Sequence, residues 1–368
     1  MLFSTTDSTV FIPSKKWNKS TPPKRILAIR LQAMGDMVIT LPYLQYLRKH
    51  LPANTQLDLL TREEVHSIPT SLKLFNHVYS IAGGRNWKKQ LILTCFMLPG
   101  LLMRRYDVVI DLQNNIISKT VRKALMPSAW SEFDRYSPVP AGECTRLTIE
   151  ASGLSCNKPD SNFTFKTNNL GISELLKSNG WNPRNHLVVL NPAGAFSTRN
   201  WPLNNYIDFA TLWKKTFPQT QFLLIGTDFI AKKAAFLQSQ LGDACINLVG
   251  KTTPLQAFAL VQEVQLVLSE DSGLMHMAWV SGIPTVALFG TTTGIRAVPL
   301  GSHSCALTAP NSSHGFSMRA THSALDCQDI SSFTVPLVFE KAIALLRSVE
   351  QHPVVPLFTN PVQIVKPR

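Results

Sequence analysis

Polar turns that follow apolar runs carry the residue types from which a site for chemistry could be built. The most informative turn spans residues 269–278 (SEDSGLMHMA) and opens a helix. Gly273 lets a ligand approach the backbone, the first helical turn offers N–H groups to a diphosphate, and His276 lies about one turn into the helix. A capped helix with a buried histidine is the alternative, but Asp271 and Ser272 add polar groups that are costly to bury without a ligand. This turn is the first candidate binding site.

A second turn, spanning residues 32–36 (QAMGD), joins the first apolar run to a helix that we expect over residues 36–50. Gly35 permits a tight change of direction, so Asp36 is expected at the carboxyl edge of the sheet, where open α/β sheets bind ligands. A carboxylate at a helix N-terminus is also what an ordinary N-cap requires. On this motif alone, the capping role is favoured.

Two further turns offer a cation and a carboxylate. The segment NPAGAFSTRNWP over residues 191–202 contains Arg199, whose guanidinium could bind a phosphate through two parallel hydrogen bonds. Pro202 suits the first turn of the next helix, so a structural purpose is compatible with a ligand at Arg199. Asp228 follows the apolar run at residues 221–225 and could accept hydrogen bonds from sugar hydroxyls, although helix capping explains it nearly as well.

Several familiar catalytic signatures are absent or incomplete in the sequence. Gly250-Lys251-Thr252 resembles the end of a phosphate-binding P-loop, but Cys245 stands where that motif needs its first glycine. No G-x-S-x-G, H-E-x-x-H, G-x-G-x-x-G or D-x-D is present, and the six cysteines form no Cys-x-x-Cys pair. A Walker NTPase, a zinc or disulfide protein and a dinucleotide-dependent dehydrogenase are therefore disfavoured.

The elements that must position these turns alternate between strands and helices. Apolar strand-like runs occur at residues 25–31, 56–60, 77–81 and 107–112, and a second series occurs at residues 187–191, 221–225, 266–269 and 284–289. Helical patterns separate the members of each series, as in parallel α/β sheets. A chain of 368 residues with 45% hydrophobic residues can bury two cores. We expect two α/β domains.

The predicted domain boundaries follow from composition. A polar, flexible N-terminal arm is expected over residues 1–24, and the two domains over residues 25–170 and 171–335, with Asn, Ser, Gly and Lys enriched in a linker near 160–183. An amphipathic helix and a tail are expected over residues 336–368, and their return to the first domain stays open.

The formal charge of +13 indicates an acidic partner, with a diffuse basic surface as an equally weighted alternative. Residues 1–160 hold 21 basic and 12 acidic side chains, a net +9, so the first half is expected to face that partner. The N-terminus does not resemble a secretory signal, and the apolar run at residues 91–103 contains Pro99 and is too short to cross a bilayer. These features favour a cytoplasmic protein. For residues 87–105 a helix of the first domain is favoured over contact with a membrane surface.

Four segments together resemble the bacterial lipopolysaccharide heptosyltransferases of glycosyltransferase family nine. They are RILAIRLQAMGDMVITLPYLQYLRKHLP, VVIDLQ, NPAGAFSTRNWP and DSGLMHMAWVSGIPTVALFG, and they occur in the family's order over residues 25–345. The resemblance implies a GT-B fold of class α/β, in which two Rossmann-like domains with parallel sheets face a central cleft. It also implies that the first domain binds the acceptor and the second binds the nucleotide-sugar donor.

The resemblance assigns roles to the candidate residues. It implies that Asp36 is the general base, and that the donor is bound by the residues Arg199, Asp228, Asp271, Ser272, Gly273 and His276. No metal site and no cofactor are implied, because the ADP-heptose donor is a substrate. Glu270 departs from the family pattern, since close relatives often carry Asn beside the aspartate.

The function implied is inverting, metal-independent transfer of a heptose-like sugar from an ADP-activated donor to the lipopolysaccharide inner core. The expected partners are the nucleotide sugar, the anionic core acceptor and the inner membrane surface, with no specific nucleic acid. A cytoplasmic location, peripheral to the inner membrane, accompanies this function. The alternative is a non-catalytic basic protein, a degenerate transferase that holds anionic lipid or nucleic acid; it explains the charge but not the turns at Asp36 and Asp271.

Overall fold

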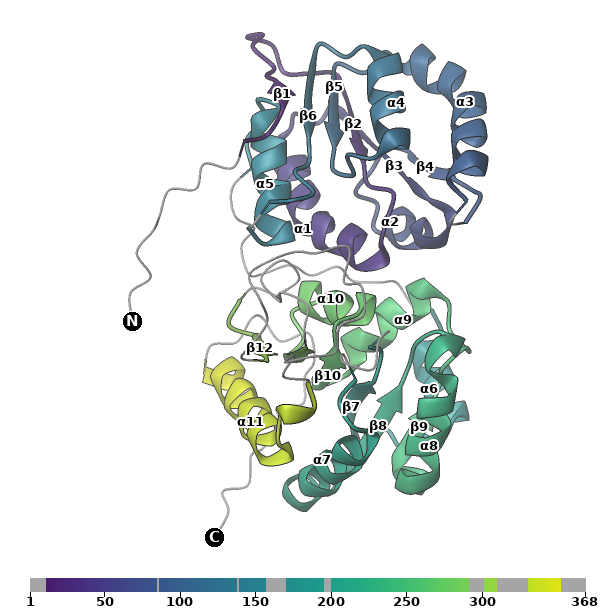
Figure 1. Ribbon diagram of the computed structural model, residues 1–368, viewed down its shortest axis with the longest axis vertical. Coiled ribbons are helices and arrows are strands. Elements are labelled where there is room, and N and C mark those ends of the chain that lie inside the picture. The colour runs from purple at the N-terminus through teal and green to yellow at the C-terminus, as the bar shows by residue number, and fades with distance from the viewer. Residues whose placement is uncertain are drawn as a thin grey trace, which may run out of the picture. The chain divides into compact units, whose positions relative to one another are not determined.

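The computed structural model describes residues 11–84, 86–137, 139–156, 170–194, 200–290, 301–309 and 330–351. The chain divides into two compact units, Met1–Lys158 and Pro159–Arg368. Each unit is built around one sheet with helices packed on it (Figure 1).

The first unit contains a sheet with the strand order β1-β6-β5-β2-β3-β4. Five strands are parallel, and only β1 pairs antiparallel, with β6. The strands are β1 (Ser14–Lys15), β2 (Arg25–Ile29), β3 (Gln56–Arg62), β4 (Val78–Ile81), β5 (Val108–Asp111) and β6 (Ala129–Glu132). The central strands β2 and β5 are nearly continuous apolar runs, as expected where helices cover both faces of a parallel sheet.

Helices of the first unit pack in two pairs, α1 with α5 and α3 with α4 (Figure 1). Asn86 and Asn115 begin α3 and α4 as N-caps, each accepting backbone N–H bonds through its side-chain oxygen. The helices are α1 (Met34–His50), α2 (Ser67–Ser71), α3 (Trp87–Arg104), α4 (Ile116–Leu125) and α5 (Ala141–Ala151), with a 3₁₀ turn η1 at Glu63–Val65.

The second unit contains a fully parallel sheet with the strand order β12-β11-β10-β7-β8-β9. The strands are β7 (His186–Asn191), β8 (Thr220–Leu224), β9 (Cys245–Asn247), β10 (Leu266–Glu270), β11 (Thr285–Phe289) and β12 (Ser304–Thr308). Four of these strands lie within or overlap the four runs of the second predicted series, while the short strands β9 and β12 were not predicted.

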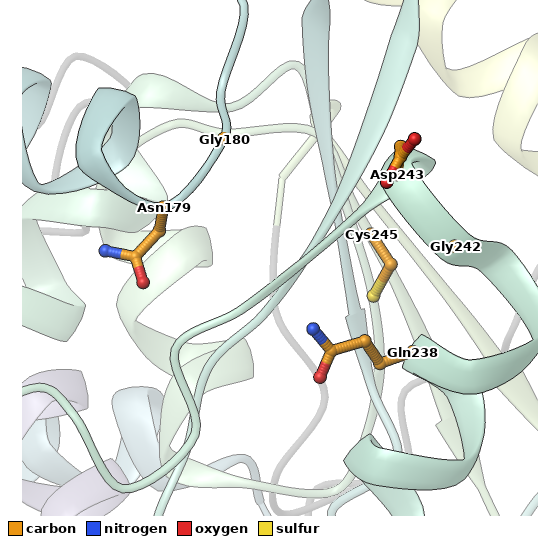
Figure 2. A pocket seen from close by; sticks show the side chains of 6 residues that line it. All are labelled: Asn179, Gly180, Gln238, Gly242, Asp243 and Cys245. Carbon is orange, nitrogen blue, oxygen red and sulfur yellow. The ribbon is translucent and has the colours of Figure 1, made fainter.

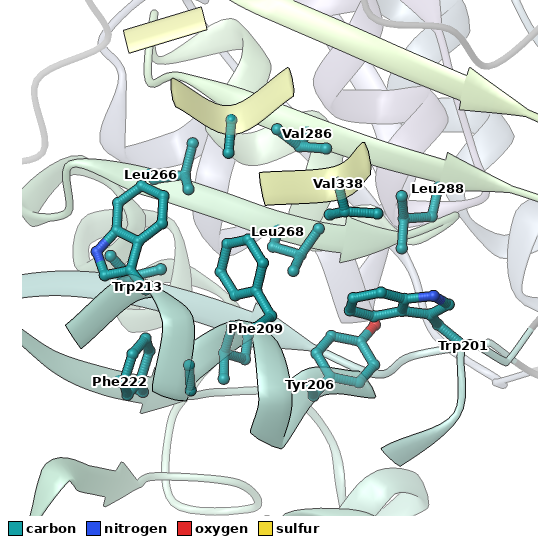
Figure 3. Close-up of a cluster of buried hydrophobic side chains, with 14 of the residues drawn as sticks. Trp201, Tyr206, Phe209, Trp213, Phe222, Leu266, Leu268, Val286, Leu288 and Val338 are labelled. Carbon is teal, nitrogen blue, oxygen red and sulfur yellow. The ribbon is translucent and has the colours of Figure 1, made fainter. Parts of the chain in front are cut away.

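Helices of the second unit surround a large aromatic core (Figure 3). Trp201, Tyr206, Phe209 and Trp213 pack beneath the sheet together with Val338 of α11, and α11 contacts α7. The helices are α6 (Ile172–Ser178), α7 (Leu203–Thr216), α8 (Ala231–Leu241), α9 (Pro254–Leu260), α10 (Gly273–Val280) and α11 (Val335–Gln351), with 3₁₀ turns at Asp228–Ile230, Gly242–Ala244, Val261–Glu263 and Ile330–Ser332.

Two segments differ from the expectation of polar, unstructured connections. Residues 11–24 belong to the predicted arm, yet Ser14–Lys15 pair with β6 and the Trp17 N–H donates to the carbonyl of Ser152 at 2.8 Å. The predicted linker near residues 160–183 contains helix α6, because Ile172 and Leu176 provide an apolar contact that composition alone concealed. Residues 1–10 and 157–169 lie outside the described residues.

Candidate functional site

Each sheet reverses its strand order at one point, between β2 and β5 in the first unit and between β7 and β10 in the second. At such a switch point the connections leave the strand ends in opposite directions, which opens a crevice at the carboxyl edge of the sheet. Asp36 follows β2, and the residues from Asp271 to His276 follow β10. The two main candidate turns therefore lie at the switch points of the two units.

Asp36 is the third residue of α1, and its side chain is 41% exposed. Its Oδ2 accepts a hydrogen bond from the backbone N–H of Ala33 at 3.0 Å, and its Oδ1 lies 2.9 Å from Nη2 of Arg30. The capping role that the sequence left open is therefore present. These contacts fix the position of the carboxylate but leave part of it exposed to solvent. A proton acceptor needs both a fixed position and access for its substrate.

Arg30 is a residue of this switch point that the sequence analysis did not single out. It is 4% exposed, its Nη1 donates to the carbonyl of Leu112, and its guanidinium lies 4.9 Å from the centroid of the Phe133 ring. Since Leu112 follows β5, Arg30 links both sides of the switch point and holds Asp36 there. The available signal was an arginine placed at the end of an otherwise apolar strand run.

Gln113, which follows β5, binds the main chain on the other side of the same switch point. Its Oε1 accepts hydrogen bonds from the backbone N–H groups of Leu31 and Gln32, at 2.9 and 2.8 Å. The backbone that leads into α1 is thus fixed by a side chain from the opposite strand.

In the second unit, Asn191 at the end of β7 holds the predicted diphosphate turn. Its Nδ2 donates to Oγ of Ser269 and to Oγ of Ser272, at 2.8 Å in both cases. Ser272 is the N-cap of α10 and accepts a hydrogen bond from the N–H of Met275 at 3.3 Å. The start of α10 is therefore positioned from the neighbouring strand across the switch point.

Glu270 is buried and accepts hydrogen bonds from the main chain, whereas the neighbouring Asp271 is partly exposed. Its Oε1 accepts hydrogen bonds from the N–H of Trp201 at 2.7 Å and from the Tyr206 hydroxyl at 3.2 Å, and its Oε2 accepts from the N–H of Gly194. Burial raises the pKa of Glu270 to about 7, against the lowering effect of the Gly194 and Trp201 hydrogen bonds. Glu270 therefore holds the main chain at Gly194 and at Trp201.

Lys233 of α8 is a second residue that sequence reasoning missed. Its Nζ donates to the carbonyl oxygens of Pro192 at 2.9 Å and Gly194 at 3.3 Å, and to Oδ1 of Asn200. Burial lowers the pKa of Lys233, and the charge of Glu270 opposes that shift. Glu270 and Lys233 thus hold both ends of residues 194–201.

The remaining predicted residues have these positions. Asp271 and Gly273 are partly exposed beside Ser272, and His276 is buried one turn along α10. Residues 195–199, which include Arg199, lie outside the described residues.

Asp228 follows β8, the strand next to β7, and therefore lies at the same edge of the sheet. Its carboxylate packs against Gly250, where an added Cβ would come within 2.0 Å of Oδ1 of Asp228. Gly250 has a φ of +72° and its N–H donates to the carbonyl of Gly226 at 2.9 Å. The absence of a side chain at Gly250 therefore leaves room for the carboxylate of Asp228.

A cavity of about 510 Å³ lies at the other edge of the second sheet (Figure 2). Cys245 begins β9, and Gly180 precedes β7, so this cavity borders the amino ends of the strands. Its remaining lining residues are Asn179, Gln238, Gly242 and Asp243. It is therefore separate from the turns at Asp228 and Asp271.

Within the described ranges, no group of three or more His, Cys, Asp or Glu side chains could hold a metal ion. None of the helices in the same ranges is both long and apolar enough to span a bilayer.

A model of glycosyltransferase family 9 (heptosyltransferase) matches residues 145–325, a range that contains the β7 and β10 turns. The lipopolysaccharide core heptosyltransferase OpsX of Haemophilus influenzae is 21% identical over 313 residues, which are 75% of this chain and 82% of that protein.

Two solved structures share the fold. A glycosyl transferase family 9 protein from Veillonella parvula has a TM-score of 0.73 at 18% identity and covers 88% of this chain and 97% of its own. The ADP-heptose lipopolysaccharide heptosyltransferase II of E. coli has a TM-score of 0.70 at 18% identity, covering 89% of this chain and 99% of its own. The predicted GT-B fold of two Rossmann-like α/β units is confirmed.

Proposed function

Because this chain belongs to glycosyltransferase family 9 and is a glycosyltransferase, we propose that it transfers a heptose-like sugar from an ADP-activated donor to the lipopolysaccharide inner core. The transfer inverts the anomeric carbon and uses no metal ion. The observation that supports this most directly is that each unit has polar groups at its switch point. The accessible carboxylate of Asp36 lies at the first, and the polar turn at Ser272 lies at the second.

The first unit binds the acceptor in this proposal. An inner-core acceptor is anionic, and residues 1–160 carry a net charge of +9. The reaction then takes place in the cytoplasm at the inner membrane surface, where such an acceptor is found. Asp36 supplies the proton acceptor at the switch point, since its carboxylate is held by Arg30 and remains accessible.

The second unit binds the donor. The N-terminus of α10, capped by Ser272, presents the positive end of the helix dipole to the diphosphate. Asp271 and Asp228 are the carboxylates that can accept hydrogen bonds from donor hydroxyls at this edge, and His276 supports the turn from within α10. Arg199 adds the cation that the departing diphosphate requires when no metal is present.

The chemical step is a single displacement. Asp36 removes the proton from the acceptor hydroxyl, the acceptor oxygen forms a bond to the anomeric carbon, and the bond from that carbon to the phosphate oxygen breaks. ADP leaves with the electron pair. Attack on the face opposite the phosphate gives inversion, and a base positioned in this way contributes on the order of 10²–10⁴ in rate.

Thermal unfolding in the presence of a panel of nucleotides and nucleotide sugars tests the donor assignment. ADP and ADP-sugars are expected to stabilise the protein more than the corresponding UDP or GDP compounds. A nucleotide present at 100 times its dissociation constant raises the free energy of unfolding by about 2.7 kcal/mol. Stabilisation by no nucleotide, together with salt-dependent binding to nucleic acid, would instead support the non-catalytic protein.

Calorimetry of variants locates the donor within the second unit. His276→Ala and Arg199→Ala are each expected to weaken ADP binding, while wild-type affinity in both would mean that the donor binds elsewhere. Turnover in excess chelator is expected to equal turnover without it, and loss of activity that a divalent cation restores would contradict the metal-independent mechanism.

A further inference from the structure

Helix α3 of the first unit exposes a set of large apolar side chains although two of its polar side chains are buried. Gln90 and Thr94 point inward and are buried, whereas Phe96 and Met103 are 80% and 82% exposed and Ile92 is 58% exposed. Surface helices normally bury their apolar stripe and expose their polar one. The inward polar groups are satisfied locally, since Gln90 donates to the carbonyl of Gly84 and the Thr94 hydroxyl donates to the carbonyl of Gln90.

The exposed apolar residues form one continuous stripe. Ile92, Phe96 and Met103 are separated by four and seven residues, the spacing that aligns side chains along one face of a helix. The opposite side of α3 is fixed, because Leu101 is buried and Leu93 packs against the core of the first unit. The stripe therefore cannot turn inward without unpacking the helix.

The ends of the same helix are basic. Lys88 and Lys89 are exposed at the start, and Arg105 is exposed directly after the end. Neither α3 nor the adjacent α4 contains an acidic residue. Trp87, 52% exposed, begins the helix in the position at which aromatic rings lie among lipid headgroups.

From this arrangement we propose that α3 is the element by which the protein docks on an anionic lipid bilayer. The helix lies in the plane of the interface, with Ile92, Phe96 and Met103 among the acyl chains. Lys88, Lys89 and Arg105 contact the headgroups. This inference deepens the proposed function, because it explains how an enzyme with a lipid-borne acceptor is held at the surface where that acceptor lies.

The chemistry of the stripe favours a bilayer over a protein partner. An apolar stripe with basic ends and no acidic residues matches an interface that is apolar inside and negatively charged outside. The 18 residues of α3 span about 27 Å, which allows the stripe to contact lipid along its whole length.

Co-sedimentation of the full chain with vesicles tests the proposal. Wild-type protein is expected to bind vesicles that contain phosphatidylglycerol and to bind pure phosphatidylcholine vesicles weakly. The double variant Phe96→Asp/Met103→Asp is expected to bind at least about tenfold more weakly. Lys88→Glu/Lys89→Glu is expected to lose about fivefold for each lysine, and this loss shrinks at high salt.

Matched variants test whether a loss of vesicle binding is specific to the apolar stripe of α3 or follows from any charge placed on the surface. Phe236→Asp alters an exposed phenylalanine on α8 of the second unit and is expected to bind vesicles like wild type. Phe96→Leu/Met103→Leu is expected to retain binding, because it keeps the stripe apolar. Circular dichroism of each variant verifies that α3 is still folded.

Three outcomes would overturn the proposal: undiminished vesicle binding by the double aspartate variant, equal loss in Phe236→Asp, or a wild-type dimer that the aspartate variant converts to monomer. The last result would assign the stripe to a second copy of this chain. Transfer to a water-soluble, deacylated acceptor is expected to be equal in wild type and in Phe96→Asp/Met103→Asp. If the proposed function is wrong, that transfer is absent from wild type while vesicle binding persists.

Discussion

The two units have the same strand order around their switch points but differ in the carboxylate near each one, Asp36 in the first turn of α1 and Glu270 at the end of β10. In the first unit Asp36 is 41% exposed and is held by one buried arginine. In the second unit Glu270 is fully buried and both of its oxygens accept backbone N–H groups. The first carboxylate keeps part of its surface open to solvent, and the second is taken up by contacts to the main chain.

This difference shows that position in the fold does not define the role of a carboxylate. Both residues lie where an open α/β sheet binds its ligand. In the proposed function, solvent access of the side chain and the identity of its partners distinguish the proton acceptor Asp36 from the backbone anchor Glu270.

The largest expected effect is that of removing the accessible carboxylate. Asp36→Asn is expected to lower transfer by on the order of 10²–10⁴, because the amide cannot accept the acceptor proton, while ADP affinity stays unchanged. Steady-state transfer assays and calorimetry measure the two quantities. Glu63→Gln, which alters an exposed carboxylate of the same unit, is the control. Unchanged turnover in Asp36→Asn would remove this residue from the mechanism.

A smaller effect is expected when the partner of Asp36 is removed. Arg30→Met deletes a hydrogen bond to a charged group, which is worth about 1.5–3 kcal/mol, and lets the carboxylate leave its position. The turnover number is expected to fall by roughly tenfold or more, with ADP affinity preserved. In the double variant with Asp36→Asn, the added loss should vanish because both residues act through the same carboxylate. Fully additive losses would show that Arg30 acts independently.

The buried carboxylate is expected to affect donor binding rather than the chemical step. Glu270→Gln keeps the shape of the side chain but places an amide nitrogen opposite a backbone N–H group, which leaves Gly194 or Trp201 without its acceptor. ADP affinity is expected to fall by about tenfold, as one lost hydrogen bond predicts. Glu263→Gln changes an exposed glutamate of the same unit and should have wild-type affinity. A loss confined to turnover, with normal ADP affinity, would contradict the anchoring role.

The smallest effect is a pH dependence of stability. Burial raises the pKa of Glu270 to about 7, above its ordinary value of 4.5, so the folded protein holds this proton more tightly than the unfolded chain does. The stability that Glu270 contributes is therefore present in acid and is lost as the pH rises through about 7. The difference in melting temperature between wild type and Glu270→Gln should decline from pH 5 to pH 8. A constant difference would mean that Glu270 does not titrate in this range.

The sequence predicted the α/β class and both main turns because each depends on local signals. Apolar runs identify buried parallel strands, and a glycine followed by Asp36 identifies a strand-to-helix turn. Residues 36–50 were expected to be helical, and α1 covers Met34–His50. These features are determined within a short stretch of chain.

The missed residues depend on contacts between distant segments. Arg30 reaches Leu112, and Lys233 reaches Pro192 and Asn200, so their partners are separated by 82, 41 and 33 positions. No periodicity encodes such contacts. Glu270 was noticed only as a departure from the family pattern, and its role emerged from the backbone groups that it binds.

The anchoring of residues 194–201 has a consequence for how this enzyme can change. Glu270 accepts from the main-chain N–H groups of Gly194 and Trp201, and every residue except proline supplies such a group. A substitution between these two positions leaves both main-chain hydrogen bonds to Glu270 available, whereas a substitution at Asn200 also removes an acceptor of Lys233. The ends of this segment can therefore stay attached to Glu270 while the side chains between Gly194 and Asn200 change.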